Sequence, residues 1–414
     1  VTTSDAGAGI GYTGIRIRGV SPQSTNITIN GIPFNDPESH GTYWVNLPDF
    51  VSSVESLQVQ RGVGTSTNGS GAFGASINIL TDAISESPYA QISNSVGSFN
   101  TLKHTVKFSS GKLNDSFELS GRLSKIDSDG YIDRAYSDLK SYFIQGAYIK
   151  GNTLIKALTF GGHEKTYQSW YGLSLDELQD NRRQNPYTYE NEIDNYKQDH
   201  YQLHWNQKLN EKWSTNLGLN YTYGRGYFEQ YREADSVDTY GGIVDSDTDQ
   251  NGNLIGTTDL IRRRWLDNNF YVLNASTNYN SSKLNLMFNT SYSTYSGDHF
   301  GEVIWARNFS KSSSIRDRYY DGNGKKTDFS LFAKGSLILN NAFEFYADFQ
   351  LRNINYKTTG YTSDLVNMLL DESYSFFNPK FGLSYKLSSQ SMVYGSYSRA
   401  NREPSRSDFE SNEK

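Results

Sequence analysis

The residue types that most often carry catalytic or metal chemistry are sparse and scattered in this sequence. The six histidines lie far apart, except for His200 and His204, which are four positions apart. On an extended strand this spacing puts both side chains on one face but about 13 Å apart, too far to share a metal ion. The sequence has neither the G-x-S-x-G motif of serine hydrolases nor the H-E-x-x-H motif of zinc proteases. We therefore expect no enzyme activity and no catalytic residues.

One acidic segment has the spacing of a calcium-binding loop. Asp247, Asp249 and Asn251 stand at alternate positions and Gly252 follows them, which reproduces the D-x-[DN]-x-[DN]-G pattern. Hard oxygen ligands at this spacing suit Ca²⁺, but Thr258 occupies the position where the pattern has a bidentate Glu. The alternative is an Asp-, Asn- and Gly-rich hairpin tip in an outer loop. The segment predicts an optional calcium site and no cofactor that the protein requires.

Two glycine-rich segments look like phosphate-binding loops. Residues 9–14 spell G-x-G-x-x-G, but a dinucleotide site needs a strand before this motif and a helix after it, and an alternating strand pattern follows here. Residues 64–71 lack the Lys-Ser/Thr pair of a P-loop. We expect both segments to form tight turns, because Gly adopts positive φ at no steric cost.

The composition combines many aromatic residues with a low overall hydrophobicity. Aromatic residues make up 14% of the 414 residues, yet the mean hydropathy is -0.66. No run approaches the roughly 20 apolar residues of a membrane-spanning helix. A membrane barrel reconciles these facts, because alternate residues face lipid and a wet lumen while Tyr and Trp gather at the interfaces. The absence of Cys excludes disulfides, and the net charge of -6 argues against nucleic acid as a partner.

The first 81 residues contain short β-like runs that are separated by Gly, Pro and Asn turns. The runs are Ile15 to Arg18, Ile27 to Ile29, Val54 to Arg61 and Ser76 to Leu80. A region this short and Gly-rich buries little core alone. We predict a small mixed α/β domain over residues 1–81, followed by a polar linker over residues 82–88 that ends in Pro88.

Four motifs in this region, taken in order, resemble the plug domain of TonB-dependent outer-membrane receptors. They are Ile17-Arg18-Gly19, Asn30-Gly31-Ile32-Pro33, Val54-Glu55-Ser56 with Arg61-Gly62, and the loop Gly69-Ser70-Gly71-Ala72-Phe73-Gly74 with Ile77-Asn78-Ile79. The resemblance implies that the sequence starts inside the plug. A signal peptide and the short segment that docks TonB would then lie upstream.

Residues 89–414 show repeated alternation of apolar and polar side chains. Leu217, Leu219, Tyr221 and Tyr223 interleave with polar residues, and residues 343–352 behave in the same way. Soluble antiparallel sheets also alternate, but strand length and the alternation of short and long connections favour an outer-membrane barrel. We count about thirteen strands, with long loops near residues 164–198, 227–262 and 300–324.

The family that the plug motifs resemble closes its barrel with twenty-two strands. The resemblance therefore implies a mainly β protein: a transmembrane antiparallel β-barrel, present here as about 13 of 22 strands, with a small mixed α/β plug inside it. An open sheet would leave two unpaired edges in lipid, so we expect the barrel of residues 89–414 to continue beyond Lys414.

The resemblance also implies a function and a cellular location. It implies active import of a scarce ligand across the outer membrane of a Gram-negative bacterium, energised by TonB and its inner-membrane complex. An iron-siderophore or iron-carboxylate complex is the expected ligand, and cobalamin, haem and oligosaccharides are the alternatives. The other class to consider is a binding or adhesion protein without transport, either in the outer membrane or as a soluble lectin-like protein. Outer-membrane lipid and lipopolysaccharide are further expected partners.

We expect the ligand site where the irregular plug segment Asn35 to Trp44, termed the apex, meets the outer loops. Aromatic faces with a few polar groups can hold a bulky chelate. The candidate residues are His40, Tyr43 and Trp44 in the apex and Tyr167, Trp170 and Tyr171 in a loop. For Trp44 and Trp170, packing or an interfacial girdle is the alternative. Arg16, Arg18 and Arg61, together with Glu55, are predicted to form plug-to-barrel ion pairs.

Overall fold

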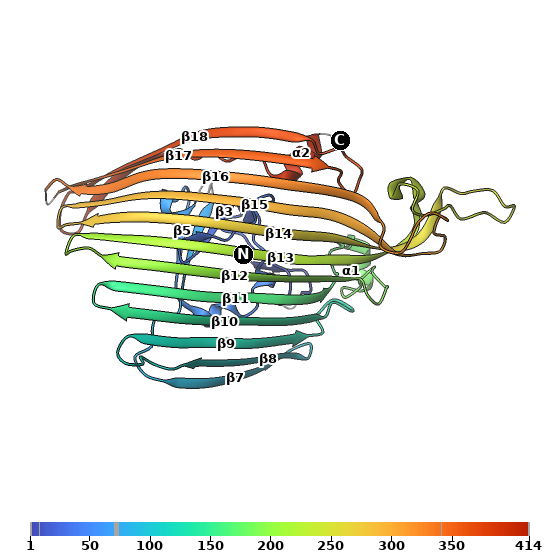
Figure 1. The fold of residues 1–414 in the computed structure, drawn as a ribbon, viewed down its shortest axis with the longest axis horizontal. Coiled ribbons are helices and arrows are strands. Elements are labelled where there is room, and N and C mark those ends of the chain that lie inside the picture. Colours follow the sequence, from blue (N-terminus) through green and yellow to red (C-terminus); the bar gives the residue numbers. More distant parts are fainter. Residues whose placement is uncertain (1, 8, 70–73, 341, 413–414) are drawn as a thin grey trace.

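The structure, a computed structural model, describes residues 2–7, 9–69, 74–340 and 342–412. It consists of a small plug, residues 2–81, and a broad curved antiparallel sheet, termed the wall (Figure 1). β6 ends at Thr81 and β7 begins at Tyr89, so the predicted linker contains neither strand nor helix. Residues 70–73 of the predicted glycine-rich loop lie outside the described residues.

The plug is built around a four-stranded sheet with the order β4-β3-β6-β5. β3 runs parallel to β6, and the other two pairs are antiparallel. The predicted strand from Ile15 to Arg18 is wrong beyond Ile15, because Arg18 and Gly19 take positive φ angles of 54° and 78° and turn the chain. The described plug elements are β1 (Thr2–Ser4), β2 (Thr13–Ile15), β3 (Thr25–Ile29), β4 (Ile32–Pro33), β5 (Val54–Arg61) and β6 (Ala75–Thr81), with the 3-10 helices η1 (Pro22–Ser24), η2 (Trp44–Asn46), η3 (Phe50–Ser53) and η4 (Ser66–Asn68).

The wall contains thirteen strands, and each strand pairs with the next one along the chain. This confirms the predicted strand number. The strands are β7 (Tyr89–Gly97), β8 (Thr101–Ser109), β9 (Phe117–Ser128), β10 (Ser137–Lys150), β11 (Thr153–Tyr167), β12 (Ile193–Lys208), β13 (Trp213–Ser236), β14 (Thr257–Asn280), β15 (Leu284–Ala306), β16 (Arg318–Ile338), β17 (Phe343–Gly360), β18 (Leu370–Lys386) and β19 (Met392–Ser398).

Helices are few and short in the described residues. α1 (Leu175–Asp180) and the 3-10 helix η5 (Val237–Tyr240) lie in connections at the end of the wall that carries the long loops, and α2 (Arg406–Asn412) follows the last strand. None of the helices described here has the length and apolar content to cross a membrane.

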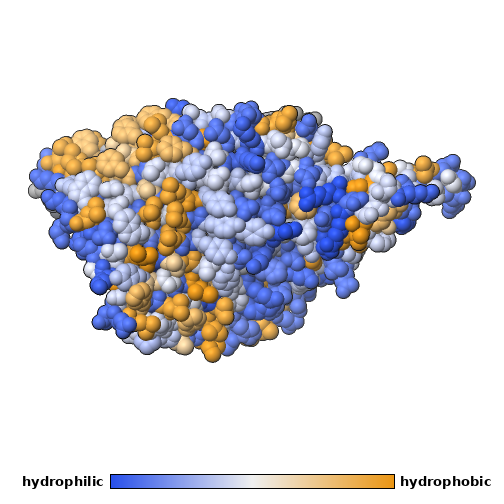
Figure 2. Space-filling view, viewed as in Figure 1, coloured by the Kyte–Doolittle hydropathy of each residue, from blue (hydrophilic) through white to orange (hydrophobic). Residues whose placement is uncertain are grey.

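The predicted long loops are shorter than the sequence pattern indicated. They span residues 168–192, 237–256 and 307–317, because the flanking strands continue further than predicted. Outside the apolar band the outward-facing side chains are polar, so alternation disappears from the sequence while the backbone ladder continues. Figure 2 shows hydrophilic side chains covering the end of the wall that carries these loops, and hydrophobic side chains gathered toward the other end.

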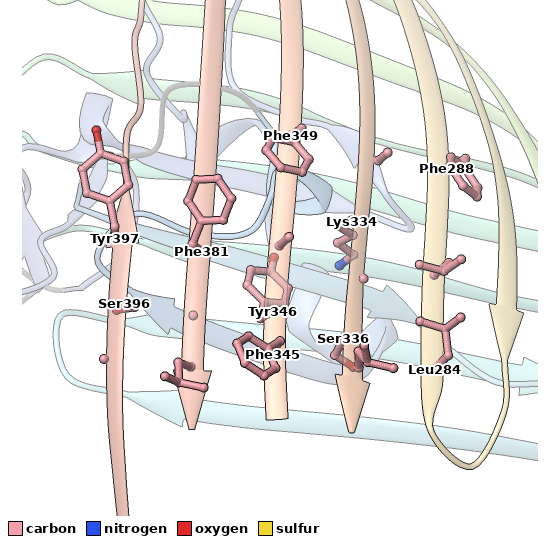
Figure 3. A pocket seen from close by; sticks show the side chains of 18 residues that line it. Leu284, Phe288, Lys334, Ser336, Phe345, Tyr346, Phe349, Phe381, Ser396 and Tyr397 are labelled. Carbon is pink, nitrogen blue, oxygen red and sulfur yellow. The ribbon is translucent and has the colours of Figure 1, made fainter. Parts of the chain in front are cut away.

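The two faces of the wall differ as the alternation predicts. On β17, Phe349 and Leu351 are exposed to 41% and 51%, whereas the alternate residues Gln350 and Arg352 are buried on the plug side. Figure 3 shows the outward side chains Phe345, Phe349, Phe381 and Tyr397 around a hollow of about 750 Å³ on strands β15 to β19. The outer face is therefore apolar, and the polar face encloses the plug.

The plug shares an apolar core with one part of the wall. Phe50 of the plug lies 5.1 Å, between ring centroids, from Phe160 of β11, which is fully buried. This core, rather than the plug alone, buries the apolar face of the plug sheet. Its buried members are Ile27, Ile29, Leu47, Phe50, Ile77 and Ile79 of the plug with Phe143, Leu158 and Phe160 of β10 and β11.

Candidate functional site

The apex, Asn35 to Trp44, is held in a fixed shape by its own side chains. The Asn35 amide accepts a hydrogen bond from the Ile27 backbone N–H at 2.7 Å and donates to the carbonyls of Thr25 and His40 at 2.9 and 3.0 Å. The Asp36 carboxylate accepts from the Ser39 backbone N–H at 2.7 Å. These local bonds replace regular secondary structure and present the neighbouring Glu38 and His40 to the wall.

Glu38 is the deepest polar contact of the apex. Its carboxylate accepts from Tyr356 Oη at 2.6 Å, lies 2.7 Å from His299 Nε2 and is 3.3 Å from the Arg406 guanidinium. Burial would raise the pKa of this carboxyl, but the contacts with His299, Arg406 and Tyr356 outweigh burial and lower the pKa to about 2. Glu38 therefore stays ionised and ties the plug to β15, β17 and α2.

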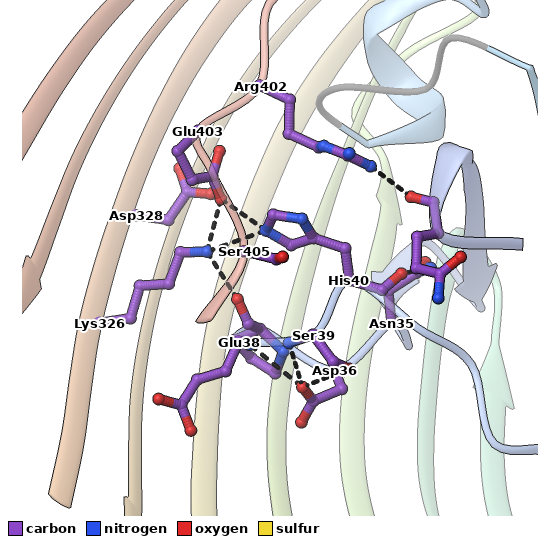
Figure 4. Close-up of polar contacts among 12 residues, drawn as sticks. Asn35, Asp36, Glu38, Ser39, His40, Lys326, Asp328, Arg402, Glu403 and Ser405 are labelled. Atoms are coloured by element: carbon purple, nitrogen blue, oxygen red, sulfur yellow. Dashed lines mark hydrogen bonds and ion pairs between the residues drawn. The ribbon is translucent and has the colours of Figure 1, made fainter. Parts of the chain in front are cut away.

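His40 meets a carboxylate that comes from the segment after β19. His40 Nε2 lies 3.2 Å from Glu403 Oε1, and Lys326 Nζ lies 2.5 Å from the same oxygen (Figure 4). Arg352 Nη1 lies 2.7 Å from the other oxygen of this carboxylate. Burial lowers the pKa of His40 below its usual range. Burial opposes ionisation of Glu403, yet Arg352, His40 and Lys326 hold the pKa of its carboxyl far below the usual range. Glu403 is thus an anion shared by two cations, Lys326 and Arg352, and the imidazole of His40.

A group of aromatic residues lies on another flank of the apex. The Trp170 ring contacts Tyr12 and Phe228 edge-on, with centroid distances of 5.8 and 5.5 Å. Trp170 is 38% exposed, Tyr43 is 44% exposed and Tyr171 is 60% exposed. These rings remain available to a bulky ligand, and Tyr12 was missed in the sequence because no pattern marks a lone Tyr in a turn.

The other predicted site residues have buried environments. Tyr167 is 4% exposed, and its hydroxyl donates to the Tyr189 carbonyl at 2.7 Å. Trp44 is half-buried beside Phe34 and packs against the shared apolar core, which matches the alternative of packing. His40 lies beneath Glu403. Of the six predicted residues, only Tyr43, Trp170 and Tyr171 present large exposed faces.

The ion pairs that the structure shows between plug and wall involve residues other than Arg18, Glu55 and Arg61. Arg16, Arg18, Glu55 and Arg61 are exposed, and the last three form none of the ion pairs among the described residues. Asp49 takes the role instead. Its carboxylate pairs with Lys103 and lies 3.4 Å from Arg122, and it accepts from Thr105 and Ser124 hydroxyls at 2.7 and 2.6 Å.

Asp49 is a strongly stabilised anion. Burial would raise the pKa of its carboxyl, but the bonds from Lys103, Ser124, Ser52 and Thr105 lower the pKa to about 2. Sequence analysis missed Asp49, Glu38 and Glu403 because their partners are distant in the chain. The available signal was a set of charged residues, such as Arg122 and Arg352, at inward-facing positions of apolar strands.

The candidate calcium segment forms a hairpin tip. Thr248 and Leu254 pair across it, and Asp249 accepts hydrogen bonds from the backbone N–H groups of Asn251 and Asn253 at 2.8 Å each. Asp247 is engaged by Arg307 at 2.9 Å. Across the described residues, no group of three or more His, Cys, Asp or Glu is arranged to hold a metal ion. Calcium binding at Asp247, Asp249 and Asn251 stays a prediction.

A curved antiparallel sheet that encloses a small mixed sheet is the architecture of a plugged β-barrel. The TonB-dependent Receptor Plug Domain model matches residues 1–76, and the model for the TonB dependent receptor-like β-barrel matches residues 145–412. The chain belongs to the TonB-dependent receptor family.

The fold of this chain is similar to that of solved receptor structures, and part of its sequence is similar to one curated protein. The fold is similar to the open form of the ferric-catecholate import receptor Fiu from E. coli K12, with a TM-score of 0.69, 16% identity, and coverage of 96% of this chain and 66% of that one. It is also similar to the siderophore receptor PiuA from Acinetobacter baumannii, with a TM-score of 0.67, 11% identity, and coverage of 96% and 59%. The probable TonB-dependent siderophore receptor PirA of A. baumannii is 28% identical over 144 residues, which are 33% of this chain and 17% of that protein.

Proposed function

We propose that this chain is the plug and part of the barrel of an importer that takes up an iron chelate across the outer membrane of a Gram-negative bacterium, energised by TonB. The observation that carries the proposal is the plug apex. Its ionic contacts, made by Glu38 and His40, are buried, while an aromatic surface beside it stays open at the end of the wall that carries the long loops. A closed plug under an open binding surface suits import of a ligand that must first be captured.

The choice of an iron chelate rests on the relatives. The similar proteins are named as ferric-catecholate, siderophore and ferripyoverdine receptors. Tyr43, Trp170 and Tyr171 offer flat faces to the organic shell of a chelate without ligating the iron. TonB, outer-membrane lipid and lipopolysaccharide are the partners that follow from this proposal.

Growth of a deletion strain on single limiting nutrients tests the proposal. We expect poor growth on at least one iron chelate and normal growth on haem, cobalamin and glycans, with rescue by the full-length gene. A defect on cobalamin or a glycan, with normal growth on every iron source, would contradict the iron assignment. Recovery of the protein in the soluble periplasm would contradict import altogether.

A further inference from the structure

A cavity of about 480 Å³ lies between the plug and strands β12 to β17. This part of the wall is termed the cavity side. Uncharged amides and hydroxyls dominate its inward lining, among them Asn216, Asn274, Ser291, Ser330 and Gln350. The volume lies within the roughly 300–1,000 Å³ of small-molecule pockets. Apart from charged groups such as Lys326, Asp328 and Arg352, this lining offers exchangeable hydrogen bonds to a passing ligand.

The opposite part of the wall, β8 to β11, is termed the packed side. There the apolar core joins plug and wall directly, and Asp49 is bound to Lys103, Thr105 and Ser124. Opening this side would expose the buried aromatic rings of the shared core, which is costly. A path past the plug therefore meets less resistance on the cavity side.

The segment after β19, residues 401–410, closes the cavity side at the end that carries the long loops, and is termed the strap. Its Arg402 guanidinium donates to the Gln23 carbonyl at 2.5 Å, and the Arg406 backbone N–H donates to the Glu38 carbonyl at 3.0 Å. Glu403 lines the cavity together with His40, Lys326 and Arg352. The strap thus holds the apex through both backbone and side-chain contacts.

The Glu403 carboxylate occupies a ready-made anion site. Lys326, Arg352 and His40 converge on it from β16, β17 and the apex, and Arg352 also pairs with Asp328 at 2.6 Å. If Glu403 left, Arg352 would keep a partner, but Lys326 and His40 would face the cavity without that carboxylate. The three donors are arranged for a carboxylate or a similar oxyanion.

We propose that Glu403 is an internal placeholder for an anionic group of the ligand, and that its displacement releases the strap and opens the cavity as the passage for import. This inference deepens the proposed function and rests on it. The anionic group of an incoming ligand binds Lys326 and His40 in place of Glu403, so the site remains charge-compensated throughout. The ligand then meets the amide and hydroxyl groups that line the cavity between plug and wall.

Cysteine labelling of the full-length receptor in outer-membrane preparations tests the gate. The chain has no native Cys, so Ser291→Cys reports on the cavity side and Ser120→Cys, buried at 4% on β9, is the matched control. We expect Glu403→Gln to raise the labelling rate of Ser291→Cys by a bulky maleimide about tenfold, the change expected from losing one charge-assisted hydrogen bond, and to leave Ser120→Cys unchanged. Equal rates with and without Glu403→Gln, in receptor whose heat-modifiable gel mobility shows a folded barrel, would overturn the gate.

Citrate, a simple tricarboxylate, probes the anion site directly. We expect sodium citrate to speed labelling of Ser291→Cys relative to sodium chloride of equal ionic strength, and Lys326→Met to abolish that difference. An identical response to both salts would overturn the placeholder role. This arm does not depend on Glu403→Gln folding correctly.

Uptake of radioactive iron by whole cells separates this inference from the proposed function. Ser291→Trp narrows the cavity side and is expected to block uptake of an iron chelate that the unmodified receptor imports. Normal uptake in Ser291→Trp would overturn the passage while leaving iron import in place. An unmodified receptor that imports no iron chelate would overturn the proposed function. The labelling results would then still test whether displacement of Glu403 opens the cavity side.

Discussion

The plug meets the packed side and the cavity side of the wall in different ways. On the packed side, apolar rings interlock and a buried Asp49 is held by four wall residues. On the cavity side, charged contacts join the apex to the wall above a polar space. Apolar packing is lost all at once when surfaces part, whereas ionic contacts can be exchanged for others of the same kind. We therefore expect the packed side to hold the plug in position, and the cavity side to open when its ionic contacts are exchanged.

The largest effect is expected from weakening the apolar core that joins the plug to the packed side. Phe160→Ala leaves a hole in the shared core and should lower the free energy of unfolding by about 3–5 kcal/mol. Phe270→Ala, at a half-buried position that lines the cavity, should cost only about 1–2 kcal/mol because less packing is lost. Urea titration in detergent, followed by labelling of a Cys at the buried Ala75 of the plug, measures both. Equal losses would show that the two sides hold the plug alike.

Asp49→Asn should loosen the packed side alone. It leaves Arg122, which is 1% exposed, and Lys103 without their carboxylate, at a cost of about 3 kcal/mol or more. We expect labelling of Ser120→Cys to rise while labelling of Ser291→Cys stays constant, the reverse of the Glu403→Gln pattern. If Asp49→Asn exposes both reporters together, the plug moves as one body and the distinction between the sides fails.

Trp170→Ala tests whether the open aromatic surface, rather than the strap, captures the ligand. We expect the affinity for the imported chelate to fall about tenfold, since a half-exposed aromatic anchor is worth about 1.4 kcal/mol. Trp213→Ala, at the end of the wall away from the long loops, should leave the affinity unchanged. Fluorescence titration of the purified receptor distinguishes them, and equal affinities for all three proteins would remove Trp170 from the site.

Acid should open the cavity side before the packed side. Burial lowers the pKa of His40 from its ordinary value of 6.5, so the closed state binds fewer protons than an open one and loses stability as pH falls below about 6.5. Asp49 has a pKa of about 2, so its contribution persists to about pH 4 and is lost only as pH falls toward 2. The charged groups facing His40 are Glu403, Lys326, Arg402 and Asp408.

Labelling at pH 7, 6 and 5 measures this order. Ser291→Cys should become more reactive, after correction for the pH dependence of the thiol with a free peptide, while Ser120→Cys should not change. His40→Gln should remove the pH response. If the pH response of labelling persists in His40→Gln, a group other than His40 causes it.

Calcium at the hairpin tip should have the smallest effect. The oxygens of Asp249 already accept hydrogen bonds from their own turn, so we expect weak binding, with a Kd on the order of 10⁻³ M. Calorimetric titration with CaCl₂ measures it, with Asp249→Asn as the control. Tight binding that Asp249→Asn abolishes would instead establish a dedicated calcium site.

The sequence revealed the wall more completely than the site. Alternation predicted the thirteen strands and their outward faces. Each strand has apolar side chains on the face toward lipid and polar side chains on the face toward the plug, so the pattern can be recognised strand by strand. Exposed aromatic residues near the apex, such as Trp170, could also be identified from the residue types in the sequence. The ionic contacts could not, since Glu38 and Arg406 are 368 positions apart and only the closed fold brings them together. The loop ends were predicted wrongly because the strands, with their backbone hydrogen bonds, continue beyond the residues where apolar and polar side chains alternate.

Strand length varies widely around the wall. β13 and β14 have 24 residues each and β15 has 23, whereas β7 and β8 have nine each. At about 3.3 Å per residue the long strands reach roughly 80 Å and the short ones roughly 30 Å, against an apolar band about 25 Å tall. Figure 1 shows the long strands β13 to β15 extending beyond the ends of β7 and β8 toward the long loops. A large particle that approaches the loop end therefore meets the long strands and their loops before it can reach the plug.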